Sequence, residues 1–308
     1  MKRNGFTLVE LVVVIALLSL MAHLAVRQLS HQTEARRTAA ANRQLEEIAA
    51  AVYATDTSGE PAGFLVDTGR LPRALPGTFT NLAEHLVPLT ISELWRCPDD
   101  LPDYAIRPAT PENLHVPESD KASLSDATVR IPCGWRGPYL RLPTGKDRLL
   151  DPWGNPFETP DDAGYARLLG ADSAAVANGS PVLRIRHLGS DARPDDQSRP
   201  AAEKEKDVTI SLTPSTGAEA ALEIYAVGLS SGAETELPPS TVTFRWYAPC
   251  GGAITGAVHT AAVSTHRFEG MPLGYAYVRV SVPTATSTVH RVSLRSGDNW
   301  LKIKFPVP

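Results

Sequence analysis

The sequence predicts an α+β protein with one long helix at its N-terminus and an all-β antiparallel sandwich at its C-terminus. Three observations support this. No Gly or Pro interrupts residues 6–58. Short, turn-rich segments fill the middle of the chain. From about residue 207 onward, runs of alternating polar and apolar residues are separated by Gly, Pro and Ser, as is typical of short strands. A length of 308 residues favours about two domains.

The bulk composition limits the function classes. Hydrophobic residues make up 43% and charged residues 21%, which suffices for ordinary cores. The net charge of -4 offers no basic field, so we expect no nucleic acid partner. The three cysteines, Cys97, Cys133 and Cys250, lack the spacing of a zinc or redox motif. Cys97 and Cys133 could pair in an oxidising compartment, or all three could remain buried thiols.

The N-terminal segment combines a short basic stretch with a long apolar run. Lys2 and Arg3 precede residues 6–29, which are long enough to cross a bilayer as a helix. The basic end should stay in the cytoplasm, so the rest of the chain would lie outside it. No A-x-A-like site follows the run, unlike an ordinary secretory signal. Glu10 is unusual there, because a carboxylate in hydrocarbon costs at least about 2.5 kcal/mol.

The helix is expected to continue beyond the apolar run. Small and apolar residues recur at helical spacing further along, namely Ala41, Leu45, Ile48, Ala49 and Val52. One helix is therefore predicted from Phe6 to about Ala54, roughly 70 Å long at 1.5 Å per residue. Its first half suits lipid or an apolar bundle. Its second half is amphipathic and needs a globular partner.

The stretch GFTLVELVVVIALLSLM, which begins at Gly5, resembles the signal of type IV prepilins and type II secretion pseudopilins. The resemblance implies that prepilin peptidase cleaves after Gly5 and that Phe6 is then N-methylated. It also assigns Glu10 to assembly. A buried carboxylate becomes tolerable when it meets a positive partner. In a filament, the methylated amine of a neighbouring Phe6 would be that partner.

Two aromatic segments indicate which branch of this family the chain resembles. WRGPYL (135–140) and DPWGNPF (151–157), preceded by DTGRLP (67–72), together resemble the major pseudopilin of type II secretion. The resemblance covers about residues 1–210 and implies a pilin fold, in which the long helix packs on a small antiparallel sheet. We expect the aromatic residues Trp135, Tyr139, Trp153 and Phe157 to be structural.

The predicted organisation has four parts. These are a leader at 1–5, a transmembrane part of the helix at 6–29, a pseudopilin-like globular domain at 30–210, and the sandwich at 211–308. Within the globular domain, TNLAEHLVPL (80–89) is a possible short helix. The stretch from Asp99 to Ser125 is rich in Pro, Asp and Glu without clear periodicity, and is expected to be an exposed insertion.

An acidic loop follows the predicted strand VLRIRHL (182–188). Calcium prefers hard oxygen ligands, which this loop offers at Asp191, Asp195, Asp196 and Asp207. The resemblance implies a calcium site here, with Asp191 and Asp207 as carboxylate ligands and the Leu188 carbonyl as a backbone ligand. Asp195 and Asp196 are weaker candidates. Ala192 departs from the family pattern, which has Gly there. A solvated acidic loop is the alternative.

The tail is expected to form about seven or eight short antiparallel strands. RFEGMPLGYAYVRVSV (267–282) resembles one hairpin of carboxypeptidase-regulatory-like and prealbumin-like sandwiches, which implies a fold rather than an activity. VTISL (208–212) either closes the pilin sheet or begins the sandwich. His259, His266 and His290 lie in the tail, with Ser264 and Asp298 nearby, but no catalytic motif accompanies them.

We therefore expect a structural subunit and not an enzyme. It would be a single-pass inner-membrane protein with its globular part in the periplasm, assembled into a type II secretion filament. The expected partners are prepilin peptidase, other pseudopilin subunits and inner-membrane proteins of the secretion machine. The alternatives are a type IV pilus subunit for adhesion or uptake, and a membrane-tethered sandwich that binds sugar or protein without forming a filament.

Overall fold

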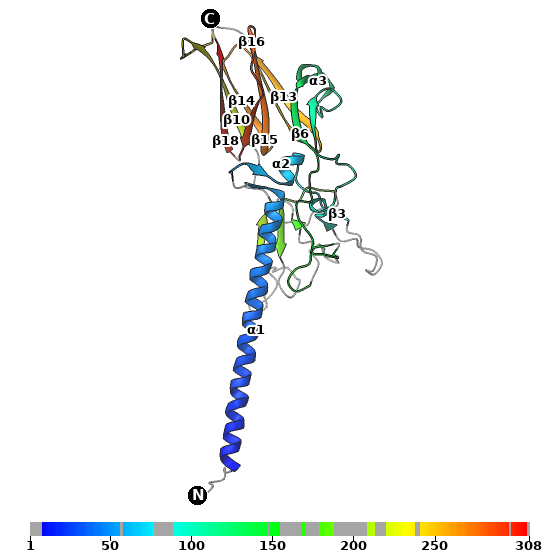
Figure 1. The fold of residues 1–308 in the computed structure, drawn as a ribbon, viewed down its shortest axis with the longest axis vertical. Helices are drawn as coiled ribbons and strands as arrows, with labels where there is room; N and C mark the ends of the chain where they lie inside the picture. Colours follow the sequence, from blue (N-terminus) through cyan, green and yellow to red (C-terminus); the bar gives the residue numbers. More distant parts are fainter. Residues whose placement is uncertain are drawn as a thin grey trace, which may run out of the picture.

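The computed structural model describes residues 8–55, 58–76, 89–146, 148–154, 168–169, 179–187, 208–212, 220–237, 241–295 and 297–306. The molecule is elongated, with the N-terminus at the free end of a long helix and the sandwich at the opposite end (Figure 1). The predicted α+β class is confirmed.

The long helix α1 runs over Leu8–Val52 as one continuous element of 45 residues. Its last turns bury the predicted apolar positions, since Leu45, Ile48 and Val52 are at most 1% exposed. This end of α1 contacts strands β8 and β9. The amphipathic half of the predicted helix therefore has the globular partner that it needs.

The sheet beneath α1 has three antiparallel strands in the order β7-β8-β9. The strands are β7 (Leu168–Leu169), β8 (Arg184–His187) and β9 (Val208–Ser211). The predicted strand VLRIRHL corresponds to β8, whose Ile185 is fully buried. VTISL corresponds to β9 and pairs with β8, so it closes this sheet rather than beginning the sandwich.

Short elements connect the helix to the rest of the chain. A five-residue helix, α2 (Phe64–Thr68), and a 3-10 turn, η1 (Ser92–Leu94), lie in this region. Two small antiparallel pairs accompany them: β1 (Ala54–Thr55) with β2 (Pro61–Ala62), and β3 (Leu75–Pro76) with β4 (Leu89–Thr90). Most of the possible helix at 80–89 lies outside the described residues, and its last residue, Leu89, begins β4.

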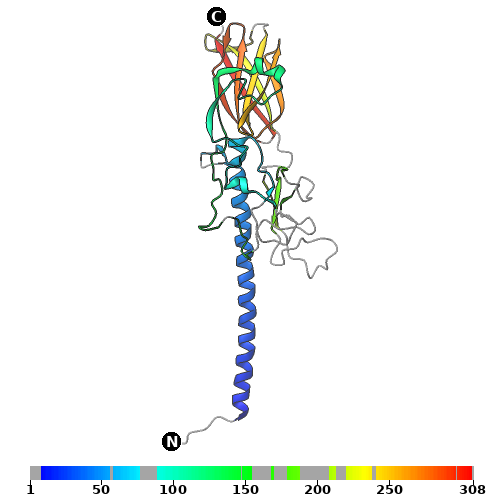
Figure 2. The ribbon, with the colours of Figure 1, turned by 90° about the vertical axis from the view of Figure 1, so that its right-hand side faces the viewer.

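The C-terminal part forms two sheets (Figure 2). In the first sheet, β10 (Ala220–Ser230) pairs with β11 (Ala233–Thr235), β14 (Thr265–Met271) and β18 (Gly297–Pro306). In the second, β12 (Val242–Cys250) lies between β13 (Ala253–Ala261) and β15 (Gly274–Val282), and β15 also pairs with β16 (Ala285–Thr286) and β17 (His290–Leu294). The β10–β18 pair is parallel, an exception to the expected antiparallel pairing.

The two sheets share an apolar interior. Leu222 and Ile224 of β10, Phe244 of β12, Val278 of β15 and Ile303 of β18 are at most 2% exposed. Each of these side chains alternates with a more exposed neighbour, as the period of two in the sequence predicted. Burial of each such side chain contributes about 1.5–3 kcal/mol to folding, so the alternation explains the sandwich.

Residues 99–125 are mostly exposed, as expected, but they form regular structure that their composition did not indicate. Together with the residues that follow, they contain β5 (Ala105–Ala109), α3 (Glu118–Leu124) and β6 (Asp126–Cys133). This arm packs on the second sheet of the sandwich, where the buried Tyr247 hydroxyl donates a hydrogen bond to the Leu124 carbonyl over 3.1 Å. Few apolar residues hold the arm in place, among them Leu114 and Leu124, which are both at most 4% exposed. Because the segment is otherwise polar, its composition did not indicate this contact.

The end of α2 touches the sandwich directly. Gly69 follows α2 with a φ of 69°, and its N–H donates to the Leu65 carbonyl. The Gly251 N–H donates to the Thr68 carbonyl over 2.7 Å. A Cβ placed on Gly69 would lie 1.7 Å from the carbonyl oxygen of Pro249. Glycine is therefore required at this junction, both for its backbone conformation and for its lack of a side chain.

Candidate functional site

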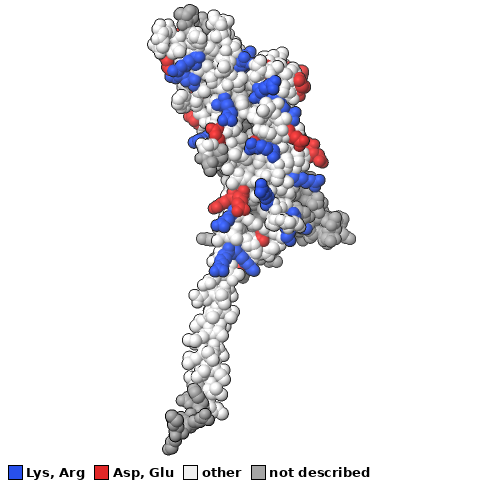
Figure 3. Space-filling model, viewed as in Figure 1, with Lys and Arg blue, Asp and Glu red and all other residues white. Residues whose placement is uncertain are grey.

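The most distinctive surface of the protein is the N-terminal half of α1. This half extends away from the globular part without contact to it (Figure 1). It contains an apolar window long enough to cross a membrane, and none of that window is buried. In Figure 3 the described residues of this part of the helix are white on the side in view, although Arg27 lies within it.

Apolar side chains surround this part of the helix instead of following one stripe. Exposed fractions range from 43% at Val14 to 80% at Leu8. The exposed large apolar residues of α1 are Leu8, Leu11, Val12, Val13, Val14, Ile15, Leu17, Leu18, Leu20, Met21, Leu24, Val26 and Leu29. Consecutive residues of a helix point in directions about 100° apart, so such a run is apolar on every side. A helix of this kind is suited to lipid or to the interior of a bundle.

The polar side chains at the end of this window have hydrogen-bond partners. The hydroxyls of Ser30 and Thr33 donate to the carbonyls four residues earlier, Val26 and Leu29, over 3.0 and 2.9 Å. Beyond them, the Trp153 indole N–H donates to Glu34 Oε1 over 3.0 Å. Trp153 belongs to the DPWGNPF segment, so this aromatic residue fixes the globular part to the helix where the apolar window ends.

The processing residues lie at the edge of the structure. Gly5 and Phe6 are outside the described residues. Glu10 is within α1, but its side chain is not among those that the structure describes. The cleavage, methylation and assembly roles of these residues therefore stay predictions.

The proposed calcium ligands cannot be located. Leu188, Asp191, Asp195, Asp196 and Asp207 all lie outside the described residues. Within the described part of the chain, no group of three or more His, Cys, Asp or Glu side chains could hold a metal ion. Calcium binding by the acidic loop stays a prediction.

The segments DTGRLP and WRGPYL meet in one polar cluster. The buried Asp67 carboxylate accepts a hydrogen bond from the Tyr139 hydroxyl over 3.0 Å and lies 3.1 Å from Arg136 Nε. Burial raises the pKa of the Asp67 carboxyl, while Arg136 and Tyr139 oppose this rise. A Cβ on Gly137 would lie 2.8 Å from the rings of Trp135 and Tyr139, which explains the glycine in this turn.

A second carboxylate, Glu93, lies fully buried beside this cluster. Its Oε1 and Oε2 accept from both terminal nitrogens of Arg70 over 2.8 and 2.7 Å. The Arg73 guanidinium also binds it, with Nη2 2.8 Å from Oε1. The Trp135 indole N–H donates to the Glu93 carbonyl over 2.8 Å. All these groups bond to one another, so their arrangement is structural, as was expected for Trp135 and Tyr139; Phe157 lies outside the described residues.

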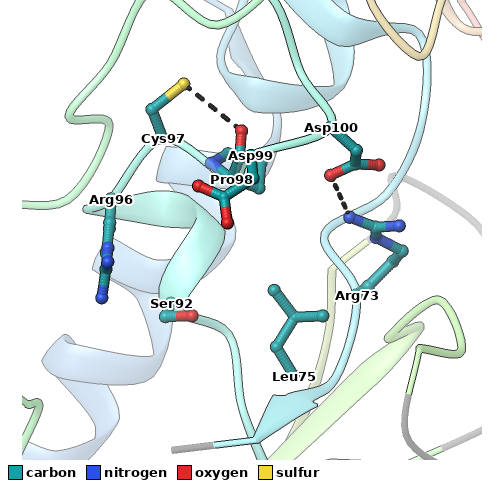
Figure 4. Close-up of a pocket in the computed structure, with 8 residues that line it drawn as sticks. All are labelled: Arg73, Leu75, Ser92, Arg96, Cys97, Pro98, Asp99 and Asp100. Carbon is teal, nitrogen blue, oxygen red and sulfur yellow. Dashed lines mark hydrogen bonds and ion pairs between the residues drawn. The ribbon is translucent and has the colours of Figure 1, made fainter. Parts of the chain in front are cut away.

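An open cleft of about 530 Å³ lies beside the Glu93 cluster (Figure 4). It is lined by Arg73, Leu75, Ser92, Arg96, Cys97, Pro98, Asp99 and Asp100. Arg73 Nη2 lies 2.6 Å from Asp100 Oδ1. Burial, together with the neighbouring carboxylates, raises the pKa of the Cys97 thiol, which disfavours the reactive thiolate. The Cys97 thiol is therefore not activated as a nucleophile in this cleft.

The cysteines are free thiols. Cys97, Cys133 and Cys250 form no disulfide, so the alternative of a Cys97–Cys133 bond is not realised. Cys133 is buried in β6, and its Sγ lies 3.5 Å from the Gly252 carbonyl oxygen.

Two of the three histidines of the tail, His259 and His266, form a stacked pair rather than a catalytic arrangement. The rings of His259 and His266 lie 3.6 Å apart and are parallel within 6°. His266 also makes an edge contact with Phe268 at 4.4 Å. Asp298 is bound to Arg267 instead of a histidine. Burial, and secondly His259, lower the pKa of His266, and burial lowers the pKa of His290.

Because the pKa of His266 is lowered in the folded protein, we predict that the sandwich loses stability as the pH falls. A lowered pKa means that folded His266 binds a proton less readily than the unfolded chain does, so its contribution is intact above the ordinary pKa of about 6.5. It is lost as the pH falls from there toward the lowered pKa. We expect Tm to decrease between pH 7.5 and 5.5, and to decrease less in His266→Gln. Equal slopes for both proteins in thermal melts would contradict this.

These features define a protein whose folded part is carried on one end of an exposed apolar helix, which is consistent with a single-pass membrane anchor. A family model described as "Prokaryotic N-terminal methylation motif" matches residues 1–26. The chain thus carries a type IV prepilin-like signal ahead of its apolar helix. The match supports a type IV pilin-like protein that is processed by prepilin peptidase and assembles with pilin-like subunits, and it suggests a structural subunit rather than an enzyme.

The comparisons with curated proteins and with solved structures find no match to this chain.

Proposed function

We propose that this chain is a pseudopilin-like structural subunit of a type II secretion filament. Prepilin peptidase would cleave after Gly5, residues 6–29 would hold the precursor in the inner membrane, and the globular part would lie in the periplasm. Assembly would proceed through the apolar half of α1. Other copies of the chain and inner-membrane proteins of the secretion machine are the expected partners.

The observation that carries this proposal is the exposure of α1 on all sides. An apolar surface of this extent in water marks a membrane or a protein partner. While the subunit is in the bilayer, lipid covers the helix. Once the subunit leaves the bilayer, only other apolar helices can replace the lipid, and they must do so all around. A bundle of like helices in a filament meets this requirement, whereas a partner on one face would not.

The contact between DTGRLP and WRGPYL supports the type II branch. These are the segments on which the resemblance to major pseudopilins rests, and Tyr139 of one donates to Asp67 of the other. Their convergence gives both segments a common structural role. A type IV pilus subunit is the second candidate, because the methylation motif is common to both classes.

The calcium site belongs to the same proposal. The acidic loop would bind the ion through Asp191 and Asp207, with Leu188, Asp195 and Asp196 as further candidates. Its oxygen ligands suit calcium, and the loop follows β8, the central strand of the sheet that packs on α1.

The test of entry into this pathway is mass spectrometry of the membrane-extracted protein, with and without prepilin peptidase. With the peptidase, we expect a chain that begins at N-methylated Phe6 and lacks the mass of residues 1–5. Without it, the chain should begin at Met1. A chain that still begins at Met1 beside active peptidase would refute the processing step and favour a membrane-tethered binding module.

A further inference from the structure

One face of the sandwich carries an aromatic pair that the proposed function does not use. In the first sheet, β10 lies between β14 and β18, and residues opposite one another share a face. Glu223 lies opposite Arg267 on one side and Trp300 on the other. Tyr225 lies opposite Lys302. We name these five residues the aromatic face: Glu223, Tyr225, Arg267, Trp300 and Lys302.

The aromatic face points away from the core. The alternate residues of the same strands, including Leu222, Ile224 and Ile303, fill the sandwich interior. Trp300 is 72% exposed. Large aromatic side chains are usually well buried, so an indole this exposed on a regular strand is informative. Tyr225 is its diagonal neighbour, since Tyr225 lies opposite Lys302, two residues after Trp300 on β18. The two rings therefore form a short platform on a rigid sheet.

Closed ion pairs border this platform. Arg267 Nη2 lies 2.6 Å from Asp298 Oδ1 on β18, and Arg267 also pairs with Glu269. At the other border, Glu234 of β11 accepts from Lys302 over 3.0 Å and from Lys304 over 2.8 Å. The cations Arg267, Lys302 and Lys304 are thus each paired with a carboxylate. Figure 3 shows the same mixture of signs over the sandwich on the side that it views.

We propose that the aromatic face binds a neutral oligosaccharide. A pyranose ring has a flat apolar C–H surface that can lie on an indole or phenol ring, and a rim of hydroxyls that both donate and accept hydrogen bonds. The face offers both parts: two rings at its centre, and cations and carboxylates on its borders that form charge-assisted hydrogen bonds. The inference goes beyond the secretion filament and does not depend on it.

Other occupants fit this face less well. Nucleic acids and anionic membranes are attracted by cations without counter-charges, and the cations here are already paired. A protein interface of standard size buries about 800 Å² on each partner and needs a broader apolar centre than two rings. A neutral ligand with many hydroxyls avoids both difficulties.

The test is calorimetric titration of the full-length protein with three hexasaccharides: cellohexaose, maltohexaose and the hexamer of N-acetylglucosamine. The protein is kept in a polyoxyethylene detergent, because maltoside detergents carry sugar headgroups that would compete. We expect binding of at least one hexasaccharide. Trp300→Ala should weaken it roughly tenfold, as expected for the loss of one stacking contact. Trp300→Phe should retain part of the affinity.

The matched control is Ile106→Ala, which removes a 63% exposed apolar side chain from β5, in the arm that covers the other sheet. It should leave sugar binding unchanged. Since Trp300 is itself exposed, its replacement should preserve the fold, which circular dichroism verifies. Absence of binding to all three sugars at millimolar concentration would overturn the proposal, and so would equal affinities of wild type and Trp300→Ala. If Trp300→Ala instead weakened cross-linking between subunits without any sugar binding, the face would be a protein interface.

Discussion

Replacement of Gly69 by alanine should destabilise the protein by about 2–5 kcal/mol. Two effects add at this position. The φ of 69° is unfavourable for a residue with a side chain, and the new methyl group would lie 1.7 Å from the Pro249 carbonyl oxygen. Because neither backbone can move without breaking the bond from Gly251 to Thr68, α2 must separate from the sandwich. Denaturant unfolding followed by circular dichroism measures the loss.

Gly59 supplies a matched control for this experiment. Its φ of 82° is similar, but nothing lies within 4 Å of a Cβ placed there. Gly59→Ala therefore introduces the same unfavourable backbone conformation but no steric clash. It should lower the free energy of unfolding by about 1–2 kcal/mol. If the two variants lost the same stability, the contact between α2 and the sandwich would contribute nothing.

Replacement of Glu10 by alanine should abolish filament assembly while leaving membrane insertion intact. The apolar helix becomes more lipid-compatible without the carboxylate, so insertion does not suffer. In the filament, the methylated amine of Phe6 would lose its partner inside an apolar bundle. Breaking a buried ion pair costs about 3–5 kcal/mol, which corresponds to more than a hundredfold in association. Cross-linking of subunits in intact cells measures this loss.

Glu10→Gln tests whether charge or shape is responsible. Glutamine keeps the size and hydrogen-bonding capacity of the side chain but has no charge, so assembly should fail here too. The matched control is Ile106→Ala, which shortens an exposed apolar side chain in β5, outside the apolar half of α1, and should assemble normally. Assembly of Glu10→Ala at the wild-type level would favour the membrane-tethered module over both filament-forming functions.

Much of the fold could be predicted because its signals are local. The absence of Gly and Pro from residues 6–58 and the spacing of Leu45, Ile48 and Val52 predicted α1 almost to its ends. The alternating runs from about residue 207 onward predicted that the tail forms short strands, and β18, which carries Trp300, lies in one of these runs. The exposure of Trp300 follows from the same pattern, since Leu301 and Ile303 point inward, but the sequence analysis did not single it out.

What the sequence analysis missed depends on contacts between distant residues. Glu93 binds Arg70, 23 residues away, and no local pattern marks this pair as buried. The arm around Leu124 has few apolar residues, so its polar composition concealed its contact with Tyr247, 123 residues away. The processing and calcium-binding residues lie in segments whose predictions rest on resemblance alone.

The buried apolar cluster extends without interruption from Leu45 of α1 through Phe64 to Phe305 in the last strand. A close-packed interior has low compressibility and transmits strain. An axial displacement of the anchor helix would therefore reach the far tip of the molecule as a rigid-body translation, without slack at the junction. The helix and the globular part would therefore move as one unit. A force applied at either end would be transmitted through the same buried side chains that keep the protein folded.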